Sequence, residues 1–265
     1  MNTTELIQQI RAKKSYLCVG LDTDIDRLPK HLGNDVSAIV EFNKAIVEAT
    51  SQYAVCYKIN TAFYEQYGAK GWEIMEETLQ LIPNSCFTIA DAKRGDIGNT
   101  GKMYAKAFLK NMSFDSITVS PYMGRDSVEP FLEYDKVAIV LGLTSNKGSV
   151  DFQHLTTPNG ALYEQVIEKV ASWGNPNNMM FVVGATQAEK LKEIRSIVPE
   201  HFLLIPGVGS QGGSLKDVSE NGLNSNCGLL VNSSRGIIYA SSGEDFAQRA
   251  GEEARKLQME MSTYL

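Results

Sequence analysis

Short apolar runs alternate with longer segments of helical periodicity along the chain. The runs are long enough for strands and too short for helices, and they cover 16–21, 54–59, 86–90, 116–120, 137–143, 180–183, 202–205 and 229–231. Apolar residues at three- and four-residue spacing predict helices over 37–52, 63–82, 100–110, 128–134, 161–173, 188–198, 215–219 and 246–261. A polar amphipathic helix is expected over 1–14.

Eight strand–helix units in succession are typical of a parallel sheet with helical crossovers. They predict an α/β fold, a closed (β/α)8 TIM barrel, and a length of 265 residues suits that fold, which typically has about 250. An open doubly wound sheet would favour a glycine-rich turn after the first strand, where this chain has Leu21-Asp22-Thr23-Asp24. Since no linker divides the chain, we expect a single barrel domain over 1–265 with an N-terminal helix.

Composition and charge narrow the classes of function. A hydrophobic content of 43% predicts a folded protein with a large core. The net charge of −6, without a long basic run, argues against binding to nucleic acid or to an acidic membrane. No apolar stretch is long enough to span a membrane, and the polar start is unlike a signal peptide. The four cysteines lie far apart, so we expect buried thiols in a reducing, cytoplasmic compartment.

The densest cluster of charge follows the third predicted strand, in the run Asp91-Ala-Lys93-Arg-Gly-Asp96. Because side chains alternate along a strand, Asp91 and Lys93 are expected on the same side of it. Charges at the end of a buried strand are costly unless they are paired or used. A structural set of ion pairs would explain this cluster of charges as well as a catalytic site would. The charges alone do not decide between the two interpretations.

In a (β/α)8 barrel, chemistry occurs at the carboxyl ends of the strands. The polar residues predicted there are Asp22, Lys58, Asn60, Asp91, Lys93, Ser120, Thr144, Ser145, Gln211 and Arg235. Lys58 stands out because lysine is rarely buried without a partner, and Asp91 is the natural partner. None of the three histidines follows a strand beside a carboxylate or a cysteine, so neither a metal triad nor a histidine-assisted nucleophile is expected.

Two loops predict a phosphate site. Pro206-Gly-Val-Gly-Ser-Gln211-Gly-Gly follows the seventh strand, and Asn232-Ser-Ser-Arg235-Gly follows the eighth. In this fold the seventh and eighth loops often bind phosphate through backbone N–H groups. Arg235 would add a bidentate contact with a permanent charge.

With these residues assembled, the chain resembles the orotidine 5′-phosphate decarboxylase family, in its longer bacterial branch. The most specific match is Asp91-Ala-Lys93-Arg-Gly-Asp96, which is similar to the family signature Asp-x-Lys-x-x-Asp. The resemblance covers essentially the whole chain, and its other matching segments are Gly20-Leu-Asp22, Tyr57-Lys58, Leu143-Thr-Ser145, the glycine-rich turn over 206–213, and Arg235.

The resemblance implies that a homodimer decarboxylates orotidine 5′-monophosphate to UMP and carbon dioxide, without a metal or an organic cofactor. It implies a charged array of Lys58, Asp91, Lys93 and Asp96, in which Lys93 donates the proton. It also implies ribose contacts from Asp22 and Thr100, a pyrimidine contact from Ser145, and phosphate contacts from Gln211 and Arg235. Asp96 and Thr100 would complete the site of the neighbouring subunit.

The implied reaction requires residues of this kind. Loss of carbon dioxide from C6 of the pyrimidine leaves a carbanion that no carbonyl group is placed to absorb, so the enzyme must stabilise this charge and supply a proton. An ammonium group at C6 does both. Carboxylates at Asp91 and Asp96 would keep Lys93 protonated in a dry pocket.

Three alternatives stay open. A sister barrel enzyme, hexulose-phosphate synthase or a sugar-phosphate decarboxylase, shares the Asp-x-Lys-x-x-Asp element but uses magnesium, and it tends to place a metal-binding Glu where this chain has Lys58. A Schiff-base aldolase would need Lys58 or Lys93 with a lowered pKa in an apolar site. A barrel that binds a phosphorylated ligand without catalysis would share the fold. Two departures from the family pattern are Asn60, where many members carry His, and the long loop over 146–159.

Overall fold

The apolar runs of the sequence become the strands of a closed barrel, in the order β1-β10-β9-β8-β5-β4-β3-β2. This computed structural model describes residues 1–185, 188–208 and 213–265. Strands pair in parallel from β1 to β3 and from β4 through β5 and β8 to β9. The predicted (β/α)8 fold is thereby confirmed. The barrel strands are β1 (Leu17–Gly20), β2 (Cys56–Asn60), β3 (Phe87–Arg94), β4 (Ser116–Val119), β5 (Val137–Leu143), β8 (Met179–Val183), β9 (Phe202–Pro206) and β10 (Leu229–Ser233).

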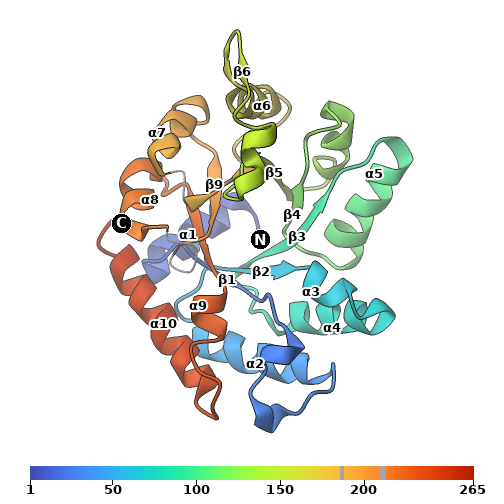
Figure 1. Ribbon diagram of the computed structural model, residues 1–265, viewed down its shortest axis with the longest axis vertical. Coiled ribbons are helices and arrows are strands. Elements are labelled where there is room, and N and C mark those ends of the chain that lie inside the picture. The colour runs from blue at the N-terminus through green and yellow to red at the C-terminus, as the bar shows by residue number, and fades with distance from the viewer. Residues whose placement is uncertain (186–187, 209–212) are drawn as a thin grey trace. The chain divides into compact units, whose positions relative to one another are not determined.

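Helices separate these strands along the chain (Figure 1). The α-helices are α1 (Thr3–Lys13), α2 (Ala38–Thr50), α3 (Ala62–Glu65), α4 (Gly68–Leu81), α5 (Gly98–Ala105), α6 (Leu162–Ala171), α7 (Ala188–Ile197), α8 (Leu215–Gly222), α9 (Arg235–Ile238) and α10 (Phe246–Met261). Short 3₁₀ helices are η1 (Ile25–Arg27), η2 (Lys30–Leu32), η4 (Arg125–Ser127), η5 (Glu129–Phe131) and η6 (Lys147–Asp151), and η3 (Lys106–Asn111) is a π-helix that continues α5. A small hairpin pairs β6 (Thr156–Thr157) with β7 (Gly160–Ala161).

The helix predicted over 63–82 is interrupted in the structure. It is divided into α3 and α4, and Gly68 begins α4 with a φ of 59°, which few residues other than glycine adopt. The two helices meet closely, because a Cβ added at Gly71 would lie 1.7 Å from the carbonyl oxygen of Tyr64. This corner is a tertiary contact that helical periodicity alone does not predict.

Contacts within the chain group into two compact units. The first comprises Met1, Glu5–Ala92 and Asn232–Leu265, and the second comprises Asn2–Thr4 and Lys93–Val231. In the first unit, α10 packs beside α2 and α9, and α2 packs beside α4 (Figure 1). Its aromatic core stacks Phe42 on Phe246 with ring centroids 5.1 Å apart.

A half-buried arginine connects several backbone carbonyl groups of the second unit. The guanidinium of Arg195 donates hydrogen bonds to the carbonyl oxygens of Gly222 and Gly228, each at 2.9 Å. It also donates to the carbonyl oxygens of Val198 at 2.9 Å and His201 at 2.6 Å. Burial lowers the pKa of Arg195 to about 10, so the group is cationic at neutral pH. One side chain therefore satisfies the end of α8 and the turns that lead into β9 and β10.

Replacing Arg195 by Met should destabilise the fold by about 3 kcal/mol, because several buried carbonyl groups lose their donor. The free energy of unfolding in urea measures this change. Arg249→Met is the matched control, since Arg249 pairs with Asp245 and Glu252 on an exposed face of α10, and it should have no measurable effect. Equal losses in the two variants would contradict the structural role of Arg195.

His201 should make the stability of the protein fall at acidic pH. Its ring packs against Phe181, and burial, with a smaller effect of Arg195, lowers its pKa to about 4. Between that value and the unfolded pKa of about 6.5, only the unfolded chain takes up the proton, so stability is full above this window and is lost as pH falls through it. From neutral pH to about pH 4.5, His201→Phe should lose about 2 kcal/mol less stability than the wild type. Parallel pH profiles of unfolding free energy would contradict this.

Candidate active site

The ends of β1, β2 and β3 bring three charged side chains together within the first unit. The Lys58 Nζ lies 2.9 Å from Asp91 Oδ2 and 3.2 Å from Asp22 Oδ1. Only 5% of the Lys58 side chain is exposed, compared with 10% for Asp91 and 18% for Asp22. The parallel register sets this meeting, because it pairs Lys58 with Gly20 on one side and Asn60 with Asp91 on the other. The predicted pairing of Lys58 with Asp91 is confirmed.

The charge state of Lys58 follows from its surroundings. Burial lowers the pKa of the ammonium group, but the carboxylates of Asp91 and Asp22 outweigh burial and raise the pKa above its usual value. Lys58 is therefore a permanent cation at neutral pH. A Schiff-base lysine needs the opposite shift, so this environment disfavours Lys58 as the nucleophile of an aldolase.

The described ranges 1–185, 188–208 and 213–265 contain no group of three or more His, Cys, Asp or Glu side chains that could hold a metal ion. Where a magnesium-dependent relative would place an acidic ligand at the end of β2, this chain has the Lys58 cation, which repels metal ions. The magnesium alternative is accordingly disfavoured by the residues themselves.

Asp22 is held by a hydroxyl group from the other end of the chain. Ser234 Oγ lies 2.8 Å from Asp22 Oδ2 and 3.0 Å from the carbonyl oxygen of Gly20. One carboxylate oxygen of Asp22 thus faces Lys58, and the other faces Ser234. Gly20 makes this approach possible, since a Cβ there would lie 2.9 Å from Ser234 Oγ.

A buried hydrogen-bond network fixes the backbone beside Asp22. The amide of Asn43 donates to Tyr64 Oη at 2.9 Å, and its oxygen accepts from Thr23 Oγ1 at 2.6 Å. Tyr64 in turn donates to the carbonyl oxygen of Leu21 at 2.9 Å. On the other side, Tyr239 Oη accepts from the Asp24 backbone N–H at 2.7 Å. Each residue flanking Asp22 is therefore anchored to a helix of the first unit or to the segment after α9.

Lys93 opens the second unit at the end of β3. It has a φ of 48°, in the left-handed region that non-glycine residues rarely adopt. Its backbone N–H donates to Thr118 Oγ1 at 2.9 Å, and Ser120 N–H donates to the Arg94 carbonyl oxygen at 2.8 Å. Gly95 then passes close to β4, because a Cβ there would lie 2.9 Å from the Ser120 carbonyl oxygen. Strand β3 is thus longer than the predicted run over 86–90, and regular alternation ends at Lys93.

The other predicted residues are distributed over both units. Asp96 is half-buried and accepts from the Ile97 N–H at 2.8 Å, and Thr100 is exposed in the first turn of α5. Ser145 follows β5 and packs against Gly184, where a Cβ would lie 2.6 Å from the serine Cβ. Arg235 is exposed at the start of α9 in the first unit. Gln211 lies outside the described residues.

Sequence reasoning missed Ser234, Tyr239 and Asn43. Ser234 precedes Arg235 in a loop already assigned to phosphate, so its position gave a signal that could have been used. Asn43 and Tyr239 gave none, because their partners come from distant segments. Asn60 has a local role as well, since its Oδ1 accepts from the Ala62 N–H at 3.3 Å where α3 begins.

The chain is similar to several known proteins. The model of the orotidine 5′-phosphate decarboxylase / HUMPS family matches residues 15–250. The chain is 56% identical to an orotidine 5′-phosphate decarboxylase of Flavobacterium johnsoniae, over 99% of this chain and 97% of that protein. The solved OMP decarboxylase of Leishmania donovani is 38% identical, with a TM-score of 0.82, over 98% of this chain and 100% of the other. The orotidine 5′-monophosphate decarboxylase of Methanocaldococcus jannaschii, solved with the inhibitor BMP, is 27% identical, with a TM-score of 0.69, over 93% and 98% of the two chains.

Replacing Lys58 by Met should remove the cation that lies between the carboxylates of Asp91 and Asp22. We expect a loss of roughly 3 kcal/mol in the free energy of unfolding at about pH 7.5. Protonation of a carboxylate relieves the repulsion, so the loss should shrink towards about pH 5. Lys70→Met, at an exposed pair with Glu73, serves as a control without measurable effect. A loss that is independent of pH would contradict the charge-pairing role of Lys58.

Proposed function

The chain belongs to the orotidine 5′-phosphate decarboxylase / HUMPS family, and from this premise we propose that it converts orotidine 5′-monophosphate to UMP and carbon dioxide, the last step of de novo pyrimidine biosynthesis. Similarity to curated decarboxylases over nearly the full length supports this activity. The structural observation that carries it is the buried Lys58 between Asp91 and Asp22, at a strand end where a metal-dependent relative would need an acidic ligand.

In the proposed mechanism, the bond between C6 and the carboxylate carbon breaks, and its electron pair stays on C6. The ammonium group of Lys93 then donates a proton to C6, which gives UMP and a neutral amine that is reprotonated from solvent. Asp91, Asp96 and Lys58 complete a preorganised array of alternating charge with Lys93, in which Lys58 balances the charge of Asp91. The hydrogen bond from the Lys93 backbone to Thr118 supports this role by fixing the origin of the side chain.

We assign the substrate contacts by the same family pattern. Asp22 holds a ribose hydroxyl, together with the partner subunit's Thr100. Ser145 binds the pyrimidine, and Gln211 and Arg235 bind the phosphate. Binding energy from the phosphate, remote from the broken bond, can lower the barrier by closing loops around the base. The anchoring of Asp22 by Ser234 and the exposure of Arg235 at the start of α9 support two of these assignments.

The same proposal includes a homodimer in which Asp96 and Thr100 complete the neighbouring site. Large apolar side chains are exposed on the segment that carries these residues, and exposed apolar surface is typical of an interface. They include Ile97 at 46%, Met103 at 51% and Tyr104 at 37% exposure, with Tyr122 and Met123 in the loop after β4. A second copy of the chain is the occupant that this arrangement favours.

We further propose that residues 1–265 act as one domain, without metal or organic cofactor, in the cytoplasm. The four cysteines are buried free thiols, which suits a reducing compartment. Within the described part of the chain, no helix combines the length and the apolar character needed to cross a membrane.

Purified protein in excess EDTA should bleach the orotate absorbance of orotidine 5′-monophosphate. Lys93→Ala should lower kcat by at least about 100-fold, because the proton donor is lost. Lys70→Ala is the matched control, since Lys70 is an exposed lysine on α4 that pairs with Glu73, and it should keep wild-type kcat.

Two outcomes would overturn this assignment. Activity that depends on added magnesium would favour the hexulose-phosphate synthase type of relative. No turnover with or without magnesium would leave a barrel that binds a phosphorylated ligand.

A further inference from the structure

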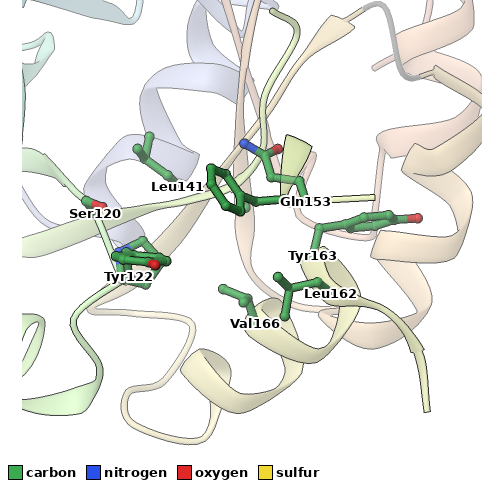
Figure 2. Close-up of a pocket in the computed structure, with 10 residues that line it drawn as sticks. Ser120, Tyr122, Leu141, Gln153, Leu162, Tyr163 and Val166 are labelled. Atoms are coloured by element: carbon green, nitrogen blue, oxygen red, sulfur yellow. The ribbon is translucent and has the colours of Figure 1, made fainter. Parts of the chain in front are cut away.

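The loop after β5, whose role the sequence does not predict, is an ordered structure in the second unit. It contains η6 and the β6–β7 hairpin, and it returns to the barrel through α6. Gln153 lies in this loop between η6 and β6, and Figure 2 shows its amide group among the residues that line a pocket.

Gln153 holds Thr144, the residue before Ser145, by two complementary hydrogen bonds. The Thr144 backbone N–H donates to Gln153 Oε1 at 2.8 Å, and Gln153 Nε2 donates to Thr144 Oγ1 at 2.8 Å. Thr144 Oγ1 in turn donates to Asn146 Oδ1 at 2.6 Å. The chain of donors and acceptors therefore includes both residues that flank Ser145.

The backbone of Gln153 is itself fixed on both sides. Its N–H donates to the Ser149 carbonyl oxygen at 2.8 Å, and its carbonyl oxygen accepts from the Tyr163 N–H at 2.9 Å. The side chain borders a cavity of about 390 Å³ whose lining includes Leu141, Leu162, Tyr163 and Val166 (Figure 2). Hydrogen bonds in such apolar surroundings are stronger than in water and are costly to leave unmade.

Ser145 is confined on its opposite side by the end of β8. A Cβ added at Gly184 would lie 2.6 Å from Ser145 Cβ and 2.8 Å from its backbone nitrogen. Only a glycine at position 184 leaves room for the serine. Ser145 is thus held between Gly184 and the segment that Gln153 braces.

We propose that Gln153 is a positioning residue for pyrimidine recognition, because it fixes the backbone that presents Ser145. This inference rests on the proposed function, in which Ser145 contacts the base. It makes the long loop a brace for the segment that carries Ser145.

Binding of two ligands distinguishes a role of Gln153 in base recognition from a general role in stabilising the fold. UMP carries the base, the ribose and the phosphate, whereas ribose 5-phosphate lacks the base. Gln153→Met should weaken UMP binding about 10-fold, which corresponds to the loss of about one to two hydrogen bonds, and should leave ribose 5-phosphate binding within about 2-fold of wild type. Calorimetric titration measures both dissociation constants.

Gln165→Met is the matched control. Gln165 lies in the first turn of α6, and its Nε2 donates to the Asn159 carbonyl oxygen at 2.7 Å, so this variant removes the same kind of amide group, also bonded to the loop, but leaves Thr144 braced. It should bind both ligands like wild type. Gln153→Glu keeps an acceptor for the Thr144 N–H but loses the donor to Thr144 Oγ1. Its affinity for UMP should therefore be intermediate between those of the wild type and Gln153→Met. The thermal unfolding midpoint of each variant is measured first, to show that the variant is folded.

Each result decides the inference. Wild-type UMP affinity in Gln153→Met overturns it, and so does an equal loss for UMP and ribose 5-phosphate, which would indicate a structural role alone. Failure of the proposed function is a different result, since it appears as a wild-type protein that does not decarboxylate orotidine 5′-monophosphate.

Discussion

The candidate site depends on one compensation of charge, in which the Lys58 ammonium lies between the carboxylates of Asp91 and Asp22. A buried cation of this kind is stable only when its partners are placed to within a hydrogen-bond length. The parallel register of β1, β2 and β3 sets this placement. A shift in the strand register would therefore also separate the paired charges. Hydrogen bonds to Asp22 and to the backbone beside it support that geometry.

Those supports are neutral and come from distant parts of the chain. Asn43, Tyr64 and Thr23 form a buried polar network that reaches the backbone next to Asp22, and Ser234 reaches its carboxylate. Fully satisfied networks of this type specify a single arrangement, whereas a partly satisfied one would destabilise the core. In the mechanism that we propose, the charged residues carry the chemistry, and the neutral residues around them hold the charges at fixed distances.

The sequence predicted most of this fold, for reasons that particular elements make clear. Strand β5 and helix α10 match the predicted 137–143 and 246–261 because their apolar patterns are uninterrupted and bounded by polar residues. The break between α3 and α4 was missed because it depends on contact between Gly71 and Tyr64. In the site, the pairing of Lys58 with Asp91 could be predicted because a buried lysine needs a counter-charge. The brace by Gln153 could not, since a glutamine in an aperiodic loop gives no sign of its partner.

The left-handed backbone of Lys93 has a consequence for how this position evolves. A lysine there carries a strain of about 1 kcal/mol or more, which a glycine would relieve. Selection for stability alone would therefore replace the lysine, and such a replacement would remove an ammonium group from the end of β3. Lys93 thus combines a locally unfavourable backbone conformation with the proton-donor role that we propose for it, a combination in which stability and activity oppose each other.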